Sequence, residues 1–481
     1  MTLKDQAISG VLWNSVGRFS SLSIEFVVGI VLARLLTPKE FGLIGTIMVF
    51  ITLSQVFINS GFSQALVRKP TCTQLDYSTA FFFNLAVGLF SFILLFFCAG
   101  YIAGFYKIPE LKPLVQVLGI TLIISSLTLI QGAILTRRID FKLQTKISVI
   151  ATVVSGIIAL LMAYKGFGVW SLVAKSLVNQ AINSALLWAW NRWKPDLVFS
   201  MASLKELFGF GSKLLVSGLI GTFFNNIYYI VIGKYFSAAD LGFYTRAELF
   251  KNLPSQNVSD IATSVSYPVL AKVQHDPARL KAGTRKIITS TFFVVAVLMF
   301  GMAAVADSLV ITLVGEKWRQ SVIYLQMLCF VGLMYPLNSI NVNLLNVVGR
   351  SDLYLKLQLI AQLLTIPVII LGIAFGIKFM ILGMCINYLF AYIYFSKVSA
   401  KYSGYSFKQQ VKDIYKPLLL VITMGVIVYL VDYLTDLKPL ITLVLQVFVG
   451  ALIVLLSGEL LKLKEYILIK TIVIEQYRKQ F

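Results

Sequence analysis

Six ionisable side chains lie inside long apolar stretches of this sequence. They are Arg18, Glu25, Lys175, Arg246, Glu248 and Lys251. A charge at the centre of a membrane helix costs at least about 2.5 kcal/mol, so the charges that remain there usually face a wet cavity or a partner. Four of the six are cations, so the interior is net positive. A positive, hydrated cavity suits a diphosphate group, because it offers donors that replace the hydration of the phosphate oxygens.

The spacing of these residues predicts polar helix faces. Arg18 and Glu25 are seven residues apart, nearly two helical turns, and therefore share one face. Lys175 is followed by Asn179 and Asn183 at successive i+4 positions, which again defines one face. We expect both faces to line the same central cavity.

Arg246, Glu248 and Lys251 lie on one predicted helix. Glu248 and Lys251 are three residues apart and can pair, while Arg246 points elsewhere. Two roles stay open for Glu25 and Glu248. Each carboxylate can hold the cavity cations when no ligand is present, or one of them can bind a coupling proton or sodium ion. A carboxyl group beside arginine tends to stay ionised, which favours the first role.

Several amides join the charged residues. Asn225 and Asn341 are the candidates that we assign to ligand binding, with Asn226, Asn338, Asn343 and Asn346 near them in sequence. Amide groups suit the hydroxyls of sugars. The alternative is that these amides join helices to one another, for about 0.6 kcal/mol each.

The composition indicates that lipid is the solvent of the elements that hold these residues. Of 481 residues 58% are hydrophobic and 13% are charged, and the mean hydropathy is +0.84. A membrane-spanning helix needs about 20 apolar residues, so we predict an all-α integral membrane protein with about fourteen transmembrane helices. The predicted spans are 11–33, 41–62, 79–103, 113–135, 147–164, 167–190, 212–233, 241–263, 288–314, 322–346, 354–376, 378–396, 417–434 and 439–460.

The net charge of +21 reflects topology rather than nucleic-acid binding. If the N-terminus is cytoplasmic, 28 of the 42 Lys and Arg residues fall on the cytoplasmic side and ten on the other. This asymmetry places both termini in the cytoplasm, where the cations anchor to anionic membrane lipids. We find no nucleotide-binding loop, nucleophile motif or metal-ligand spacing, and therefore expect no catalytic residue, no metal and no cofactor.

An internal repeat divides the chain. Residues 32–42 match residues 232–242 in the order of cation, small polar residue, acid and glycine, at an offset of 200. Six helices separate the copies, and an even number restores the original direction. We therefore predict two parallel six-helix lobes, residues 1–200 and 201–400, followed by residues 401–481 with two further helices and a basic tail.

Short motifs along nearly the whole chain carry a family resemblance. They are Gly10–Trp13, Leu32–Pro38, Glu40–Gly42, Leu241–Ala247, Asn252–Pro254, Tyr267–Leu270, Gly315–Trp318 and Gly349–Arg350. As an ordered set they resemble the Wzx-type polysaccharide and O-antigen flippases of the multidrug/oligosaccharidyl-lipid/polysaccharide (MOP) superfamily, in particular the colanic-acid exporter branch.

The resemblance implies a fold like that of the multidrug and toxin extruders (MATE) and a transporter rather than an enzyme. It implies that an undecaprenyl-diphosphate-linked oligosaccharide is flipped across the bacterial inner membrane, from the cytoplasmic to the periplasmic leaflet, by alternating access. Surface polysaccharide machinery, such as a polymerase, is the expected protein partner. Arg18 and Arg246 carry over as cavity cations, whereas Lys175 stands where a neutral polar residue is expected. The predicted substrate-binding set is Arg18, Lys175, Arg246, Lys251, Asn225 and Asn341.

Three other functions stay open. A cation-coupled multidrug extruder would share the fold, but cationic drugs favour an acidic cavity. A lipid II flippase would also fit. A membrane-embedded saccharide polymerase or ligase, from another functional class, would be expected to carry a large outer loop with catalytic residues, and the loops here are short.

Overall fold

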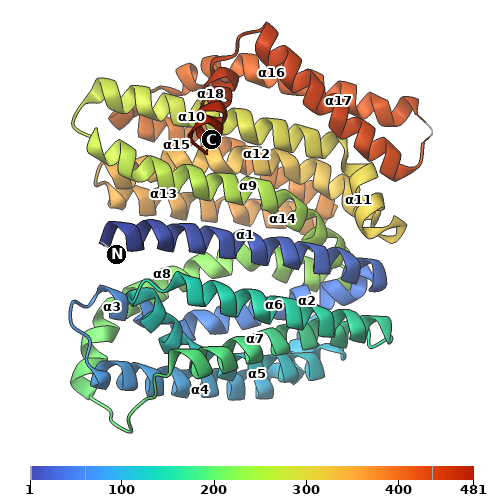
Figure 1. Ribbon diagram of the computed structural model, residues 1–481. Helices are drawn as coiled ribbons and strands as arrows, with labels where there is room; N and C mark the ends of the chain where they lie inside the picture. Colours follow the sequence, from blue (N-terminus) through green and yellow to red (C-terminus); the bar gives the residue numbers. More distant parts are fainter. Residues whose placement is uncertain (1–2, 60, 436, 481) are drawn as a thin grey trace. The chain divides into compact units, whose positions relative to one another are not determined.

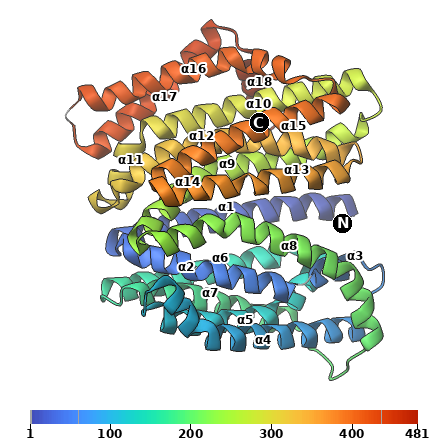
Figure 2. The same ribbon diagram turned by 180° about the vertical axis from the view of Figure 1, so that it is seen from behind.

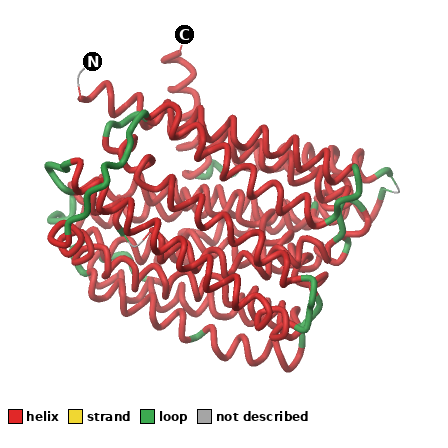
Figure 3. The backbone as a smooth tube through the Cα atoms, turned by 90° about the horizontal axis from the view of Figure 1, so that it is seen from below, coloured by secondary structure: helices red, strands yellow, loops and turns green. Residues whose placement is uncertain are grey.

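The computed structural model describes residues 3–59, 61–435 and 437–480, and the described part contains helices and no strand (Figures 1 and 3). The helices are α1 (Leu3–Leu35), α2 (Pro38–Asn59), α3 (Phe62–Arg68), α4 (Gln74–Tyr106), α5 (Leu111–Arg137), α6 (Phe141–Tyr164), α7 (Val169–Asn191), α8 (Met201–Tyr235), α9 (Ala238–Lys272), α10 (Pro277–Ala304), α11 (Ala306–Val314), α12 (Gln320–Val347), α13 (Ser351–Leu363), α14 (Thr365–Phe375), α15 (Ile377–Ser403), α16 (Phe407–Leu434), α17 (Pro439–Leu460) and α18 (Lys464–Gln480), with a 3-10 turn at Glu316–Trp318. The prediction of an all-α membrane protein is confirmed.

Twelve helical segments in the described part are long and apolar enough to cross a membrane. Each of the fourteen predicted spans overlaps one or two helices of the described part, but the count of fourteen is not confirmed, because α7 and α9 are absent from the twelve. Both are long enough, with 23 and 35 residues. Their many polar and charged side chains lower their hydropathy, so tertiary packing has to protect those groups from lipid.

The first compact unit extends to Gly242. Within it α4 packs on α5, α1 on α6, α6 on α7, and α2 on α8. Buried aliphatic side chains of α2 and α5, among them Ile47, Leu114 and Leu118, form the core between these helices. The unit includes α8, which the repeat at residue 200 assigns to the second lobe. The predicted lobe boundaries at residues 200 and 400 are drawn from the sequence repeat and not from contacts between helices. The division into these lobes therefore remains a prediction.

The two copies of the repeat begin their helices in the same way. The backbone N–H and hydroxyl of Thr37 donate to Glu40 Oε2 over 2.6 and 2.9 Å. At the equivalent position of α9, the N–H and hydroxyl of Ser237 donate to Asp240 Oδ2 over 3.2 and 2.6 Å. These bonds occupy orphan donors at each helix start and place an acid where the helix dipole favours it.

Two glycines of the repeat make reciprocal close contacts within the first unit. A Cβ atom on Gly42 would overlap the carbonyl oxygen of Ala238, and one on Gly242 would overlap that of Pro38. Pro38 and Ala238 are themselves 200 residues apart, as are the glycines. The first turns of α2 and α9 therefore cross so closely that only glycine fits at either position.

The second compact unit runs from Phe243 onward. In this unit α12 packs on α10 and α15, α10 on α16, and α14 on α15. The hairpin of α16 and α17 lies at one side of this unit in both Figures 1 and 2, and the two helices contact each other directly. Helix α11 packs on α17, where Ser308 Oγ donates to Gln446 Oε1 over 2.8 Å.

Candidate binding site

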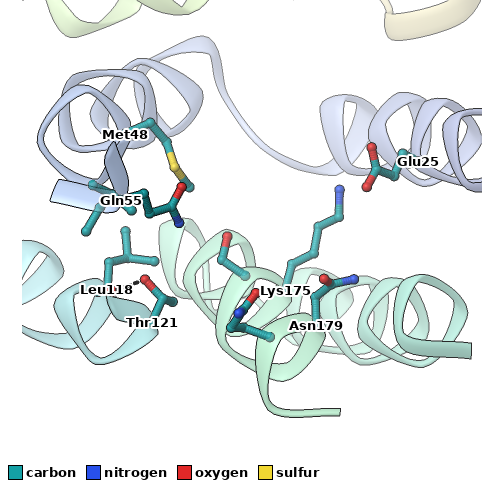
Figure 4. Close-up of a pocket in the computed structure, with 10 residues that line it drawn as sticks. Glu25, Met48, Gln55, Leu118, Thr121, Lys175 and Asn179 are labelled. Atoms are coloured by element: carbon teal, nitrogen blue, oxygen red, sulfur yellow. Dashed lines mark hydrogen bonds between the residues drawn. The ribbon is translucent and has the colours of Figure 1, made fainter. Parts of the chain in front are cut away.

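A polar pocket of about 250 Å³ lies among four helices of the first unit (Figure 4). Its lining is Glu25 from α1, Met48, Ile51 and Gln55 from α2, Leu118 and Thr121 from α5, and Lys175, Ser176, Asn179 and Gln180 from α7. Helices α2, α5 and α7 pack on one another, so the pocket lies where their faces converge.

Helical spacing explains which residues reach the pocket. On α2 the lining residues Met48, Ile51 and Gln55 are three and four positions apart and therefore share one face. On α7 Lys175 and Asn179 are four positions apart and both line the pocket. This confirms the prediction that they lie on the same face of the helix. The predicted third member of that face, Asn183, is not part of the lining.

Hydrogen bonds to neighbouring helices or within the same helix orient the polar side chains of the lining. Asn179 Nδ2 donates to Ser155 Oγ of α6 over 3.3 Å. Gln180 Nε2 donates to Thr128 Oγ1 of α5 over 3.5 Å, and the hydroxyl of Thr121 donates to a carbonyl of its own helix over 2.6 Å. Because these bonds restrict the side-chain rotamers, the lining presents these polar groups in a defined geometry.

The pocket brings together one cation and one carboxylate. Figure 4 shows the Lys175 side chain extending from α7 toward Glu25 on α1, so both charged groups face the same space. Glu25 and Lys175 are the charged residues of this lining, which is therefore neutral as a whole. Together with the amides, the two groups supply both strong donors and strong acceptors of hydrogen bonds.

Two other predicted residues of the first unit lie elsewhere. Arg18 and Asn225 are exposed on α1 and α8 and do not line this pocket. Their assignment to substrate binding remains a prediction, as does the binding role of Lys175 and the coupling role of Glu25.

The predicted cations of the second unit are buried in helix packing. Arg246 is 4% exposed, and its guanidinium lies 5.1 Å from the centre of the fully buried Trp318 ring, a cation–π contact. Lys251 is 8% exposed, and its aliphatic stem packs on Gly332 of α12. Glu248, on the same helix, is half-buried. This environment favours a structural contribution from both cations, and their predicted contact with substrate remains untested.

Asn341 is fully buried in a hydrogen-bonded network of the second unit. Its amide oxygen accepts from Ser399 Oγ over 2.7 Å and from Gln410 Nε2 over 3.2 Å. Its amide nitrogen donates to the carbonyl of Leu337 over 2.9 Å. These bonds join α12, α15 and α16, so they favour the interhelical role over the predicted contact with sugars.

Sequence reasoning missed Gln55, Thr121 and Ser176. Gln55 is an amide within a mostly apolar stretch of α2. A polar side chain in such a stretch is a signal that could have identified it as a candidate. Thr121 and Ser176 carry small hydroxyls, which are common in membrane helices and give no such signal. Within the described residues, no cluster of three or more His, Cys, Asp or Glu side chains is arranged to hold a metal ion.

Comparison with known proteins gives the family. A family model described as polysaccharide biosynthesis protein matches residues 31–323, more than half of the chain. The teichuronic acid biosynthesis protein TuaB of Bacillus subtilis is 27% identical over 354 residues, 73% of each chain. The lipopolysaccharide biosynthesis protein WzxC of Escherichia coli is 24% identical over 443 residues, 89% of this chain and 88% of that one.

Solved structures identify the fold. The lipid II flippase MurJ, in an inward closed conformation, superposes with a TM-score of 0.75 at 15% identity and covers 94% of this chain and 100% of its own. An inward-facing multidrug resistance MATE family transporter of the MOP superfamily superposes with a TM-score of 0.63 at 13% identity and covers 82% and 99%. The predicted MATE-like fold is confirmed.

These comparisons confirm the family resemblance, and the two solved structures of this fold are transporters rather than enzymes. The apolar helices agree with a multi-pass location in a membrane. The chain belongs to the polysaccharide biosynthesis protein family and has the fold of the MOP superfamily transporters.

Proposed function

We propose that this protein is a flippase that moves an undecaprenyl-diphosphate-linked oligosaccharide from the cytoplasmic to the periplasmic leaflet for surface polysaccharide synthesis. The observation that carries the proposal is the polar pocket inside a bundle of apolar helices. The headgroup of such a lipid cannot cross hydrocarbon unless its hydration is replaced by protein groups. The amides, hydroxyls and charges of the pocket are groups of that kind.

The names of the relatives support this cargo. TuaB and WzxC are named for the biosynthesis of teichuronic acid and lipopolysaccharide, and MurJ is named as a flippase of lipid II. Transport by alternating access between two parallel repeats would expose the pocket to each side in turn while the prenyl chain stays in lipid.

The charge of the pocket argues against a cationic drug as cargo. An extruder of cations gains from a negatively charged site, whereas this lining balances Glu25 with Lys175 and is otherwise neutral. A flippase of neutral or acidic saccharides has no such requirement.

Location, coupling and partners complete the proposal. We infer an inner-membrane protein with both termini in the cytoplasm, driven by a proton or sodium gradient and working beside the polymerase that consumes its product. Fusing alkaline phosphatase, which is active only in the periplasm, to the C-terminus should give an inactive enzyme. An active fusion would reverse the proposed orientation.

The function can be tested by gene deletion and by reconstitution. Deletion in the source bacterium should abolish surface polysaccharide and accumulate the lipid-linked repeat unit, and the wild-type gene should restore both. Purified protein in proteoliposomes should move a fluorescent lipid-linked oligosaccharide between leaflets. Chemical conversion of that lipid by the protein in detergent, without a bilayer, would show an enzyme and overturn the proposal.

A further inference from the structure

We propose that the pocket of the first unit binds one sugar unit of the cargo and not its diphosphate. The inference rests on the proposed function and names the part of the substrate that this site recognises. It is carried by three properties of the pocket, which are its size, its two chemically different walls and its balance of charge.

The size limits what the pocket can hold. Its volume of about 250 Å³ lies below the range of roughly 300–1,000 Å³ that is typical of sites for drug-sized molecules. A whole lipid-linked oligosaccharide headgroup is larger than such a molecule. The space within the pocket therefore holds only a fragment of the cargo, about the size of one sugar ring, and the rest of the cargo lies outside it.

The walls match the two kinds of surface on a sugar. Met48, Ile51 and Leu118 form an apolar wall from α2 and α5. The polar groups come chiefly from α7, where Lys175 extends into the space and Asn179 lies beside it (Figure 4). A sugar ring has apolar C–H faces and a rim of hydroxyls, so it can use both walls at once. A diphosphate has no apolar face and gains nothing from the first wall.

The charges favour hydroxyl groups over phosphate. A diphosphate would be attracted by Lys175 and repelled by Glu25 in the same small space, so the two effects oppose each other. A sugar hydroxyl can accept from the ammonium group, and another can donate to the carboxylate. Both are charge-assisted hydrogen bonds, which are roughly twice as strong as neutral ones.

Gln55 and Thr121 are the residues that we expect to select the sugar. They project from α2 and α5 into the pocket, on the helices that supply the apolar wall (Figure 4). A site that hydrogen-bonds a particular hydroxyl discriminates against an analogue that lacks it, because its own polar groups are then left unpaired. Exchanging these two residues should therefore change which sugar is accepted.

The test is protection of a thiol introduced into the pocket. Ser176→Cys and Met48→Cys are labelled separately with a small methanethiosulfonate reagent, and the unsubstituted chain, with its four cysteines, measures the background. The competitors are the free repeat-unit saccharide, cleaved from its lipid, and inorganic diphosphate. We expect the saccharide to slow labelling at least fivefold and diphosphate to leave it unchanged. Protection by diphosphate alone, by neither competitor, or an absence of labelling at both positions would overturn the inference.

Two substitutions sharpen the result. Gln55→Leu in the Ser176→Cys background should raise the saccharide concentration needed for protection about fivefold, the effect of one lost hydrogen bond. Gln116→Leu is the matched control, because Gln116 lies on α5, outside the lining, and bonds to the carbonyl of Phe96 over 3.4 Å. An equal effect of both substitutions would overturn the assignment of Gln55.

Proteoliposome transport separates this inference from the proposed function. If the wild-type protein moves the lipid-linked oligosaccharide but the saccharide gives no protection, the sugar site is wrong and the flippase stands. If the wild-type protein moves no lipid-linked oligosaccharide, the proposed function fails, whatever the labelling shows.

Discussion

The two compact units use the charges within their helices in opposite ways. In the first unit Lys175 and Glu25 face a pocket that a solute can enter. In the second unit Arg246 lies on Trp318, and Lys251 packs on Gly332 of α12, with at most 8% of either residue exposed. A charge in an apolar sequence can therefore face a pocket or make a packing contact, and its burial distinguishes the two.

The amides repeat this contrast. Asn179 in the first unit is held by one neighbour and still lines the pocket. Asn341 in the second unit is fully buried and has both polar ends of its side chain bonded. A buried amide whose bonds are satisfied specifies how helices pack, whereas an amide on a pocket wall keeps the capacity to bind a ligand.

The largest expected effect tests the close crossing of α2 and α9 at Gly42 and Gly242, the glycines that the two copies of the repeat share. Gly42→Ala and Gly242→Ala should each destabilise the protein by about 3 kcal/mol, because the new methyl group overlaps a backbone carbonyl that cannot rotate away. Unfolding in detergent micelles measures the loss. Gly100→Ala, where nothing lies within 4 Å of the new atom, is the control and should cost nothing. A tolerated Gly242→Ala would refute the close crossing.

The next largest effect concerns Arg246, one of the two buried cations that we describe in the second unit. A double-mutant cycle of Arg246→Met and Trp318→Leu should give a coupling free energy of about 2 kcal/mol, typical of a desolvated cation–π pair. Thermal unfolding of the four proteins provides the values. A coupling near zero would mean that Arg246 is not a packing residue, and the contrast between the units would disappear.

Lys175 is expected to show the opposite behaviour. Lys175→Met should reduce flipping in proteoliposomes about tenfold, equivalent to 1.4 kcal/mol, because a charge-assisted bond to the cargo is lost. Its unfolding free energy should change by less than about 0.5 kcal/mol, since the side chain is only half-buried. Lys251→Met is the matched comparison and should affect stability instead. Equal effects of the two substitutions on transport would break the comparison.

The smallest effect is expected from an exposed ion pair of the first unit. Lys39 Nζ lies 2.9 Å from Glu110 Oε1, with more than half of each side chain exposed. Lys39→Ala should change the unfolding free energy by less than about 0.5 kcal/mol, and added salt should remove even that difference. A larger loss of unfolding free energy would show that this exposed ion pair also contributes to helix packing.

Much of the helix pattern could be predicted from the sequence, because apolar stretches and caps are local signals. The repeat at an offset of 200 residues correctly matched Thr37 with Ser237 and Gly42 with Gly242, whose caps and crossing are equivalent in the structure. The caps depend on residues three positions apart, so short sequence motifs determine them. The crossing joins residues about 200 positions apart, so the motif supplies the glycines and the tertiary structure brings them together.

The fate of each polar residue was decided only by the tertiary structure. Lys175, Arg246 and Asn341 look alike in sequence, as polar side chains in apolar surroundings, yet one faces a pocket and two are buried. Likewise, Gln55 and Thr121 join the pocket only because α2 and α5 turn those faces toward α7. The physical reason is that periodicity defines the faces of a helix, whereas the packing of neighbouring helices selects the face that remains open.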